Sequence, residues 1–370
     1  MAFVACRSAR RALLFTFLTL ALLLLLSACA PRLAPAGPGL AAAGLDAAAL
    51  TENAFITSDG SRLPLRAWLP ATGRQPHGVV LALHGFNDYS HAFAESGPAL
   101  ALQGLAVYAY DQRGFGEAPH RGLWAGTEVL TGDLATAAAL LRQRHPGMPL
   151  YLLGESMGGA VVLAAMAGPA PPAVDGIVLV APAVWGRSTM PFHQRAALWI
   201  SVRLFPGARF SGRGLGIQAS DNIEMLRALG RDPLFIKETR VDAVYGLVNL
   251  MDAALQAAPE IDSATLLLYG AKDEVVPAAP TFTFWRHLPS EVAGQHRFAL
   301  YEDGWHMLLR DLQAQVVIED IAAWTRDPSS PLPSPAEDYA AAALAREAAE
   351  EAGGAPAAPA EETAPTPCAE

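Results

Sequence analysis

Six short apolar runs, interspersed with stretches long enough for helices, mark the middle of this 370-residue sequence. They are continuously apolar rather than alternating, which is typical of parallel strands buried on both faces. Ala/Leu-rich stretches such as residues 91–102 and 128–144 separate several of the runs. Strand and helix therefore alternate, and the pattern predicts an α/β fold with a mostly parallel, doubly wound sheet covered on both faces. The runs are residues 79–83, 106–110, 150–153, 176–180, 265–269 and 298–301.

The domain predicted from this pattern spans residues 51–326 and begins with a hairpin. Residues 55–61 and 63–69 read as two strands, with Asp59-Gly60 at a turn that favours Asp-Gly. With 52% hydrophobic residues, the chain can bury a large core, whereas both ends differ in composition from the middle. The domain therefore lies between two ends of different composition.

The sequence Gly154-Glu155-Ser156-Met157-Gly158 lies between a predicted strand and an apolar predicted helix. A Gly-x-Ser-x-Gly pattern is weak alone because both residue types are common in loops. Between a strand and a helix it predicts a sharp, strained turn that exposes a serine hydroxyl as a nucleophile. Ser156 is therefore the candidate nucleophile.

A serine hydroxyl needs a base to take its proton and an acid to orient that base. In chain order, Asp273 follows one predicted strand and His306 follows the next, as expected for parallel strands whose carboxyl ends meet at one edge. We assign Asp273 as the acid and His306 as the base. The alternatives are Glu274 and Asp303 as acids, and His296 as a poorer base because it precedes its strand.

The oxyanion of an acyl-transfer intermediate requires N–H donors that are already in place. One is expected from the backbone of Met157, directly after the nucleophile, and the other from Phe86, in the loop after the strand at residues 79–83. His84 in the same loop is expected to be structural.

Five segments together resemble the monoacylglycerol lipase and lysophospholipase-like α/β-hydrolases, over about residues 55–324. The resemblance implies the α/β-hydrolase fold and hydrolysis of single-acyl glycerolipid esters through an acyl-enzyme, without a metal or organic cofactor. Asn87 departs from the family, several members of which have glycine there. Asp111 and Arg113 are expected to hold the fold. The segments are His84-Gly85-Phe86, Asp111-Gln112-Arg113-Gly114-Phe115-Gly116, Gly154-Glu155-Ser156-Met157-Gly158-Gly159, Gly270-Ala271-Lys272-Asp273 and Gly304-Trp305-His306.

The strand rhythm is interrupted over about residues 185–262, which in that family form a helical cap. Residues 190–205 and 233–258 have helical lengths. Their large apolar side chains either form an acyl-chain tunnel or pack the cap onto the core, and for each residue alone we expect packing. These side chains are Phe192, Leu198, Trp199, Leu204, Phe205, Leu234, Phe235, Leu247 and Leu250.

The N-terminus reads as an export signal over residues 1–28, with arginines before an apolar run. Leu26-Ser27-Ala28-Cys29 resembles a bacterial lipobox, which implies lipid attachment at Cys29 and location in the cell envelope, at the outer membrane facing the periplasm. An uncleaved signal anchor is the alternative. The Ala/Gly/Pro-rich residues 29–50 are expected to be a flexible tether.

The C-terminal residues 327–370 are rich in Ala, Pro and Glu and are predicted to be mostly disordered, with a short helix around residues 337–352. This tail contributes −8 to the formal charge of −10, the signal contributes +3, and the remainder carries −5. That charge argues against nucleic-acid binding. With Cys6 in the signal and Cys29 acylated, Cys368 has no partner for a disulfide.

Two classes of function remain open. The first is an esterase or lipase acting on monoacylglycerols, lysophospholipids or other small acyl esters, and an acyltransferase or peptidase would use the same three residues. The second is a noncatalytic lipoprotein that binds ligands, which has no need of Ser156, Asp273 and His306 together. Epoxide hydrolases and dehalogenases are disfavoured because they carry Asp at the position of Ser156.

Overall fold

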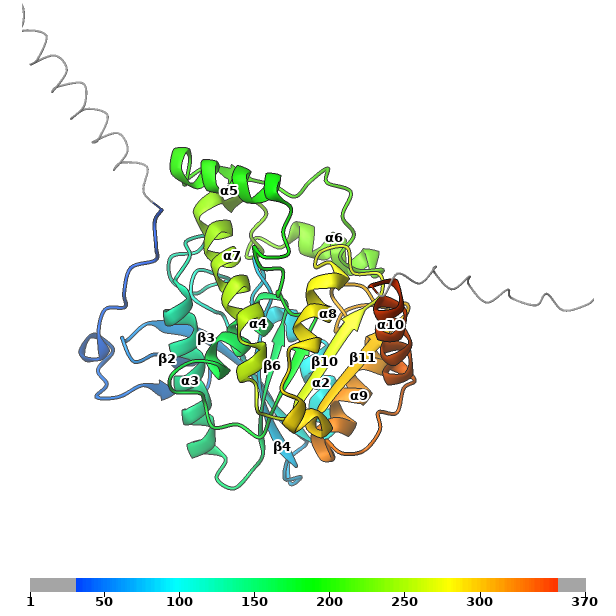
Figure 1. Ribbon diagram of the computed structural model, residues 1–370. Coiled ribbons are helices and arrows are strands. Elements are labelled where there is room, and N and C mark those ends of the chain that lie inside the picture. Colours follow the sequence, from blue (N-terminus) through cyan, green and yellow to red (C-terminus); the bar gives the residue numbers. More distant parts are fainter. Residues whose placement is uncertain (1–30, 352–370) are drawn as a thin grey trace, which may run out of the picture.

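The computed structural model describes residues 31–351, which fold around a nine-stranded sheet (Figure 1). The strand order is β1-β2-β3-β5-β4-β6-β7-β10-β11. The strands are β1 (Ala49–Leu50), β2 (Ala54–Ile56), β3 (Arg62–Trp68), β4 (Gly78–Leu83), β5 (Leu105–Tyr110), β6 (Leu150–Glu155), β7 (Gly176–Val180), β10 (Thr265–Gly270) and β11 (His296–Tyr301).

The strands from β5 to β11 in this order are parallel, and each of them coincides with a predicted apolar run. All six residues of β4 are buried, as are those of β6, because both strands lie in the middle of the sheet. The predicted hairpin is also present, since β2 and β3 pair antiparallel with Phe55 opposite Leu63. The predicted α/β fold is confirmed.

Helices cover both faces of the sheet. The face packed by α2 and α9 buries Phe93 and Trp324, and the face packed by α3, α4 and α8 buries Phe55 and Phe284. Helix α7 packs on α4. These helices are α2 (Ser96–Leu102), α3 (Thr127–Arg144), α4 (Met157–Met166), α7 (Val241–Gln256), α8 (Ala278–Arg286) and α9 (Ala314–Arg326), and the short 3₁₀ helices are η1 (Leu40–Ala43), η2 (Ser90–Phe93), η3 (Ala258–Glu260) and η4 (Ser290–Gln295).

Between β7 and β10 the chain forms α5 (Phe192–Leu204), α6 (Ile223–Arg231) and α7, with a small antiparallel pair of β8 (Arg209–Phe210) and β9 (Thr239–Arg240). Helix α5 matches the prediction at residues 190–205, whereas α6 was not predicted. The expectation that the apolar residues pack onto the core is wrong for four of them, because α5 buries Val202 alone. The four exposed side chains are Phe192, Trp199, Leu204 and Phe205.

The predicted tether is corrected for its described part, because this part lies against the domain. The N–H of Arg32 donates to Oδ2 of Asp242 at 3.0 Å, and the N–H of Gly37 donates to Oδ2 of Asp59 at 2.7 Å. The backbone here has polar partners on the domain, which a composition rich in Ala, Gly and Pro does not reveal. The predicted signal over residues 1–28 and Cys29 lie outside the described residues.

The predicted disordered tail is wrong for residues 327–351, which include helix α10 (Ala336–Glu351) packed beside β11, and the short predicted helix is confirmed. Ser334 Oγ donates to Asp320 Oδ2 at 2.6 Å, and the N–H of Leu332 donates to Glu337 Oε2 at 2.8 Å. The helix thus covers the edge strand of the sheet, which would otherwise expose unpaired backbone groups. Within residues 31–351, no helix combines the length and apolar character needed to cross a membrane.

Candidate active site

Ser156 occupies the turn between β6 and α4, with a φ of 52°. A non-glycine residue with positive φ is strained, at a cost on the order of 1–3 kcal/mol, and such residues concentrate at functional sites. The turn is fixed on both sides, since the N–H of Ser156 donates to Val180 O at 2.9 Å and the N–H of Ala183 donates to Ser156 O at 2.9 Å. Ser156 is partly exposed, whereas both of its neighbours in the chain are buried.

The glycines around this turn permit a close approach between strand and helix. A Cβ atom at Gly158 would lie 2.1 Å from the backbone oxygen of Leu83, and one at Gly154 would lie 2.4 Å from the backbone nitrogen of Gly159. Both distances are too short for a side chain, so the small residues at these positions are a steric requirement of the turn.

His306 and Asp273 come from the loops after β11 and β10, and the structure brings them together. His306 Nδ1 lies 2.8 Å from Asp273 Oδ2, and both side chains are almost fully buried. The other oxygen of Asp273, Oδ1, accepts from the N–H groups of Val275 at 2.7 Å and Val276 at 2.9 Å. The carboxylate is therefore held by the backbone in the orientation that binds the imidazole.

The three alternative residues do not join this pair. Glu274 Oε2 accepts from the N–H of Gln218, and Asp303 forms an exposed ion pair with Lys272 at 2.6 Å. His296 does not precede its strand as expected but is its first residue, at the start of β11. It therefore lies at the opposite end of that strand from His306.

The environment of His306 favours its protonated form. Burial lowers the pKa of His306, but the Asp273 carboxylate beside it and the charge of Glu155 raise it, and the net shift is upward. Because Nδ1 faces Asp273, Nε2 is the ring nitrogen left for a proton exchange with another group.

Phe86 lies in the loop after β4, and its neighbour Asn87 has a φ of 68°. Asparagine tolerates this left-handed conformation, which explains how it replaces a glycine here. Asn87 also binds the loop to the cap. Its side-chain Nδ2 donates to Thr239 Oγ1 at 2.7 Å, and its backbone carbonyl oxygen accepts from the N–H of Ile236 at 2.9 Å. Met157 is the first residue of α4, where backbone N–H groups have no intrahelical acceptor.

Ser156, His306 and Phe86 line a single cavity of about 420 Å³. Side chains of the cap, which includes α7, supply a large part of its remaining surface, and this surface is largely apolar. A cavity of this kind, with a few polar groups at one place, is typical of a small-molecule site. The apolar lining includes Trp185, Met190, Val244, Leu247, Val248 and Met251.

A buried ion cluster that the sequence analysis missed also borders the cavity. Arg310 Nη1 donates to Asp88 Oδ2 at 2.7 Å, and Arg310 Nη2 donates to Glu155 Oε2 at 3.3 Å. Each member lies close in sequence to a predicted site residue, because Glu155 precedes Ser156, Asp88 follows Phe86 and Arg310 follows His306. Burial lowers the pKa of Arg310, but the two carboxylates raise it by more, so the net shift is upward. The arginine therefore remains charged.

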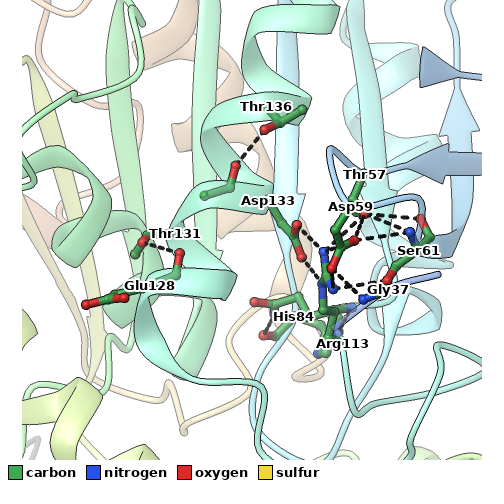
Figure 2. A network of polar contacts seen from close by, with 12 residues as sticks. Gly37, Thr57, Asp59, Ser61, His84, Arg113, Glu128, Thr131, Asp133 and Thr136 are labelled. Atoms are coloured by element: carbon green, nitrogen blue, oxygen red, sulfur yellow. Dashed lines mark hydrogen bonds and ion pairs between the residues drawn. The ribbon is translucent and has the colours of Figure 1, made fainter. Parts of the chain in front are cut away.

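His84, Asp111 and Arg113 hold loops, as expected. The N–H of Gln112 donates to His84 Nε2 at 2.9 Å, and Asp111 Oδ1 accepts from Ser90 Oγ at 2.6 Å. Figure 2 shows Arg113 between Asp59 of the hairpin turn and Asp133 of α3. Arg113 pairs with Asp59 at 2.6 Å and with Asp133 at 2.6 Å. Within residues 31–351, no three His, Cys, Asp or Glu residues are grouped to hold a metal ion.

Comparisons with known proteins identify the family of this chain. The model of the Hydrolase_4 family, described as serine aminopeptidase S33, matches residues 74–313. The chain is 26% identical over 278 residues to a monoacylglycerol lipase of Mycolicibacterium smegmatis, covering 74% of this chain and 96% of that protein. It is 25% identical over 277 residues to the monoglyceride lipase of Homo sapiens, and the match covers 73% of this chain and 88% of that protein.

Two solved structures share the fold. One is a soluble variant of monoglyceride lipase from Saccharomyces cerevisiae in complex with a substrate analog, with 20% identity, coverage of 74% of this chain and 94% of that chain, and a TM-score of 0.64. The other is a monoacylglycerol lipase from Paleococcus ferrophilus, with 22% identity, coverage of 72% and 99%, and a TM-score of 0.60. Since the family model spans more than half of the chain, this protein belongs to the Hydrolase_4 family (serine aminopeptidase, S33), and it is an α/β-hydrolase similar to the monoglyceride lipases.

Proposed function

We propose that this carboxylic ester hydrolase cleaves single-acyl lipids, such as monoacylglycerols or lysophospholipids, through an acyl-enzyme on Ser156. The observation that carries the proposal is one shared site: Ser156 and His306 line the same apolar cavity, and His306 Nδ1 is 2.8 Å from Asp273. A cavity of 420 Å³ lies in the lower half of the range for small-molecule sites, which favours one acyl chain over several.

In the proposed mechanism, Ser156 Oγ attacks the ester carbonyl while His306 Nε2 takes the hydroxyl proton. The ester C–O bond then breaks, and His306 gives the proton to the departing alcohol. Water, deprotonated by His306, then attacks the acyl carbonyl; the bond to Ser156 Oγ breaks, His306 returns the proton to Oγ, and the fatty acid is released. Asp273 stabilises the imidazolium formed in each half-reaction and keeps its ring oriented.

The negative charge of each tetrahedral intermediate would be stabilised by the backbone N–H groups of Met157 and Phe86. The position of Met157 at the start of α4 supports this role, because the positive end of the helix dipole adds to the hydrogen bond. Gly85 supports the role of the Phe86 loop. A Cβ placed on Gly85 would lie 3.4 Å from Ser156 Cβ, so this loop passes directly beside the nucleophile.

The family description names an aminopeptidase, and the same triad could cleave peptides. Such an enzyme must bind the free amino group of its substrate, which calls for an available carboxylate. Glu155 and Asp88 line the cavity, but Arg310 is already paired with both. An apolar site whose acids are neutralised favours acyl esters over peptides. Transfer of the acyl group to an alcohol remains chemically open, because it differs only in the acceptor.

The substrate class is tested with a matched series of esters and amides. We expect turnover of monoacylglycerols and p-nitrophenyl acyl esters, little turnover of triacylglycerols, and none of aminoacyl p-nitroanilides. Ser156→Ala should abolish the turnover of all these substrates. Ser211→Ala, at an exposed cap position, should leave their turnover in place. Faster hydrolysis of aminoacyl anilides than of esters would favour the peptidase. Acylated glycerol as the main product at high glycerol would favour the transferase.

The location of the enzyme is a separate proposal. The lipobox-like Leu26-Ser27-Ala28-Cys29 supports lipid attachment at Cys29 and an outer-membrane position facing the periplasm. Feeding cells a labelled fatty acid should label the wild-type protein but not Cys29→Ser. Equal labelling of both proteins would argue against this anchor.

A further inference from the structure

A cavity of about 430 Å³ lies where the cap meets the domain. Its lining residues are drawn from three segments: residues 121–122 in the loop between β5 and α3, and residues 209–213 and 233–238 in the cap. None of these residues lines the cavity that contains Ser156, so the two cavities are distinct. The volume is within the range for small-molecule sites. A ligand here would contact both the domain and the cap.

The charge of this lining is opposite to that of the chain. Arg121, Arg209, Arg213 and Lys237 contribute four positive charges and Glu238 contributes one negative charge, a net of +3. The chain as a whole carries −10. We call this cavity the basic cavity. An excess of cations at one opening of an acidic protein favours an anionic ligand.

The cations of the basic cavity are available to a ligand. Its three arginines are exposed, and none of them forms an ion pair within residues 31–351. Lys237 Nζ donates to the backbone oxygen of Asp232, a neutral acceptor that leaves the positive charge in place. Guanidinium groups bind phosphate oxygens through paired N–H donors, and an ammonium group adds a point charge. A phosphate between these like charges would also relieve their repulsion.

The remaining lining suits an organic ligand. The basic cavity also presents the side chain of Ser211, whose hydroxyl can donate or accept a hydrogen bond, and the apolar side chains of Phe235 and Ile236. These groups match the hydroxyl and carbon part of a phosphate ester, which inorganic phosphate lacks. The chemistry of the lining therefore favours an esterified phosphate.

One wall of the basic cavity is joined to the loop after β4, beside the nucleophile. The N–H of Ile236 donates to the backbone oxygen of Asn87 at 2.9 Å, and Asn87 Nδ2 donates to Thr239 Oγ1 at 2.7 Å. Lys237 lies between these two attachment points in the chain. A ligand held by Lys237 would fix this segment, and through it the loop that includes the proposed oxyanion donor Phe86.

We propose that the basic cavity binds the phosphate group of a phosphate ester, and that the bound anion promotes ester hydrolysis through the loop after β4. Two sources supply this chemistry: the head group of a lysophospholipid substrate, and a soluble phosphate ester that acts as an effector. The first source rests on the proposed function. Binding of the anion does not depend on the reaction at Ser156.

Calorimetry on the full 370-residue chain in a nonionic detergent tests the binding. The chain carries Ser156→Ala, so that the result is independent of catalysis. The probe is glycerol 3-phosphate, and glycerol is the uncharged control. The cavity variant adds Arg209→Gln and Arg213→Gln. Its matched control adds Arg74→Gln and Arg195→Gln, which removes the same charge at exposed positions outside the basic cavity.

We expect glycerol 3-phosphate to bind and glycerol not to bind. The cavity variant should raise Kd for glycerol 3-phosphate by about 10–100-fold, because each lost guanidinium removes charge-assisted hydrogen bonds. The control variant should keep Kd within about twofold, because distant exposed charges are screened by salt. Absence of binding, equal binding of glycerol, or equal Kd values in the two variants would overturn the proposal.

Kinetics of the chain with Ser156 intact separate the two sources. If the head group occupies the basic cavity, the two Gln replacements in it should lower kcat/KM for lysophosphatidylglycerol by about tenfold or more. They should leave kcat/KM for a monoacylglycerol with the same acyl chain unchanged, and glycerol 3-phosphate should compete with the lysophospholipid. If a soluble ester occupies it, glycerol 3-phosphate should raise kcat for the monoacylglycerol by about fivefold or more, and the two replacements should abolish this effect.

Binding of glycerol 3-phosphate without either kinetic effect would overturn the link to the loop after β4. Failure of the proposed function would instead show as no turnover of either ester. Failure of the anion site would show in the calorimetry, which needs no turnover.

Discussion

Asp273 binds His306 through one oxygen while the backbone holds the other. Oδ2 lies 2.8 Å from Nδ1 of the imidazole, and Oδ1 accepts from the N–H groups of Val275 and Val276. The aspartate thus cannot rotate without losing hydrogen bonds to its own loop. Its partner is therefore held with Nδ1 toward the acid and Nε2 free for catalysis.

Replacing this acid should disable the base without removing it. We expect Asp273→Asn to lower kcat by about 10³–10⁴-fold, because an amide no longer stabilises the imidazolium and can favour the wrong tautomer. The matched control is Asp303→Asn, which breaks an exposed ion pair with Lys272 and should keep kcat within about twofold. Steady-state hydrolysis of a p-nitrophenyl ester measures both. A larger loss in Asp303→Asn would assign the acid to Asp303 instead.

The pH profile should report the pKa of His306. The base must be neutral to take a proton, so activity falls as pH drops through its pKa. Because that pKa is raised, the acidic limb of kcat/KM should lie above the ordinary histidine value of about 6.5. Glu155→Gln removes a negative charge that raises the pKa, so the limb should move to lower pH. An unchanged limb, or a shift to higher pH, would contradict this electrostatic account.

The ion cluster should matter more to folding when it is broken than when it is removed. Arg310→Met leaves Asp88 and Glu155 buried without their cation, which should cost about 3–5 kcal/mol in the free energy of unfolding. Adding Asp88→Asn and Glu155→Gln removes those charges and should recover much of the loss. Urea denaturation of the single and triple variants measures both. A triple variant less stable than Arg310→Met would show that the charges themselves are stabilising.

Helix α10 should stabilise the domain that it covers. Deleting residues 328–370 removes Leu332, whose burial alone is worth about 1.5–3 kcal/mol, so Tm should fall by several degrees, at roughly 2–4 °C per kcal/mol. It also uncovers the edge strand β11, so the shortened protein should aggregate more readily. The control deletes only residues 352–370. Equal Tm values for the two deletions would mean that α10 adds no stability.

The sheet and the placement of Ser156, Asp273 and His306 were accessible from the sequence. Continuous apolar runs identify buried parallel strands, and the residues that follow such strands meet at one edge of the sheet. The order Ser156, Asp273, His306 along the chain already suggested their roles as nucleophile, acid and base.

Other features depend on contacts that local patterns do not encode. Arg310 and Asp88 are 222 positions apart, and each alone resembles a surface charge. Helix α10 was predicted as a short helix inside a tail whose composition is typical of disorder, but its packing on β11 was not predicted. The apolar residues of α5 suggest burial, yet the fold leaves them exposed. In each case the tertiary environment decides, and local composition suggests the opposite.

The central claim is that Ser156 carries the acyl group. The most direct measurement is to react the full chain with a fluorophosphonate and to locate the adduct by peptide mass spectrometry, alongside monoacylglycerol turnover. The account predicts one adduct, on Ser156, whose formation abolishes turnover, and none in Ser156→Ala. An adduct on another residue, or turnover that persists when Ser156 is fully modified, would contradict it.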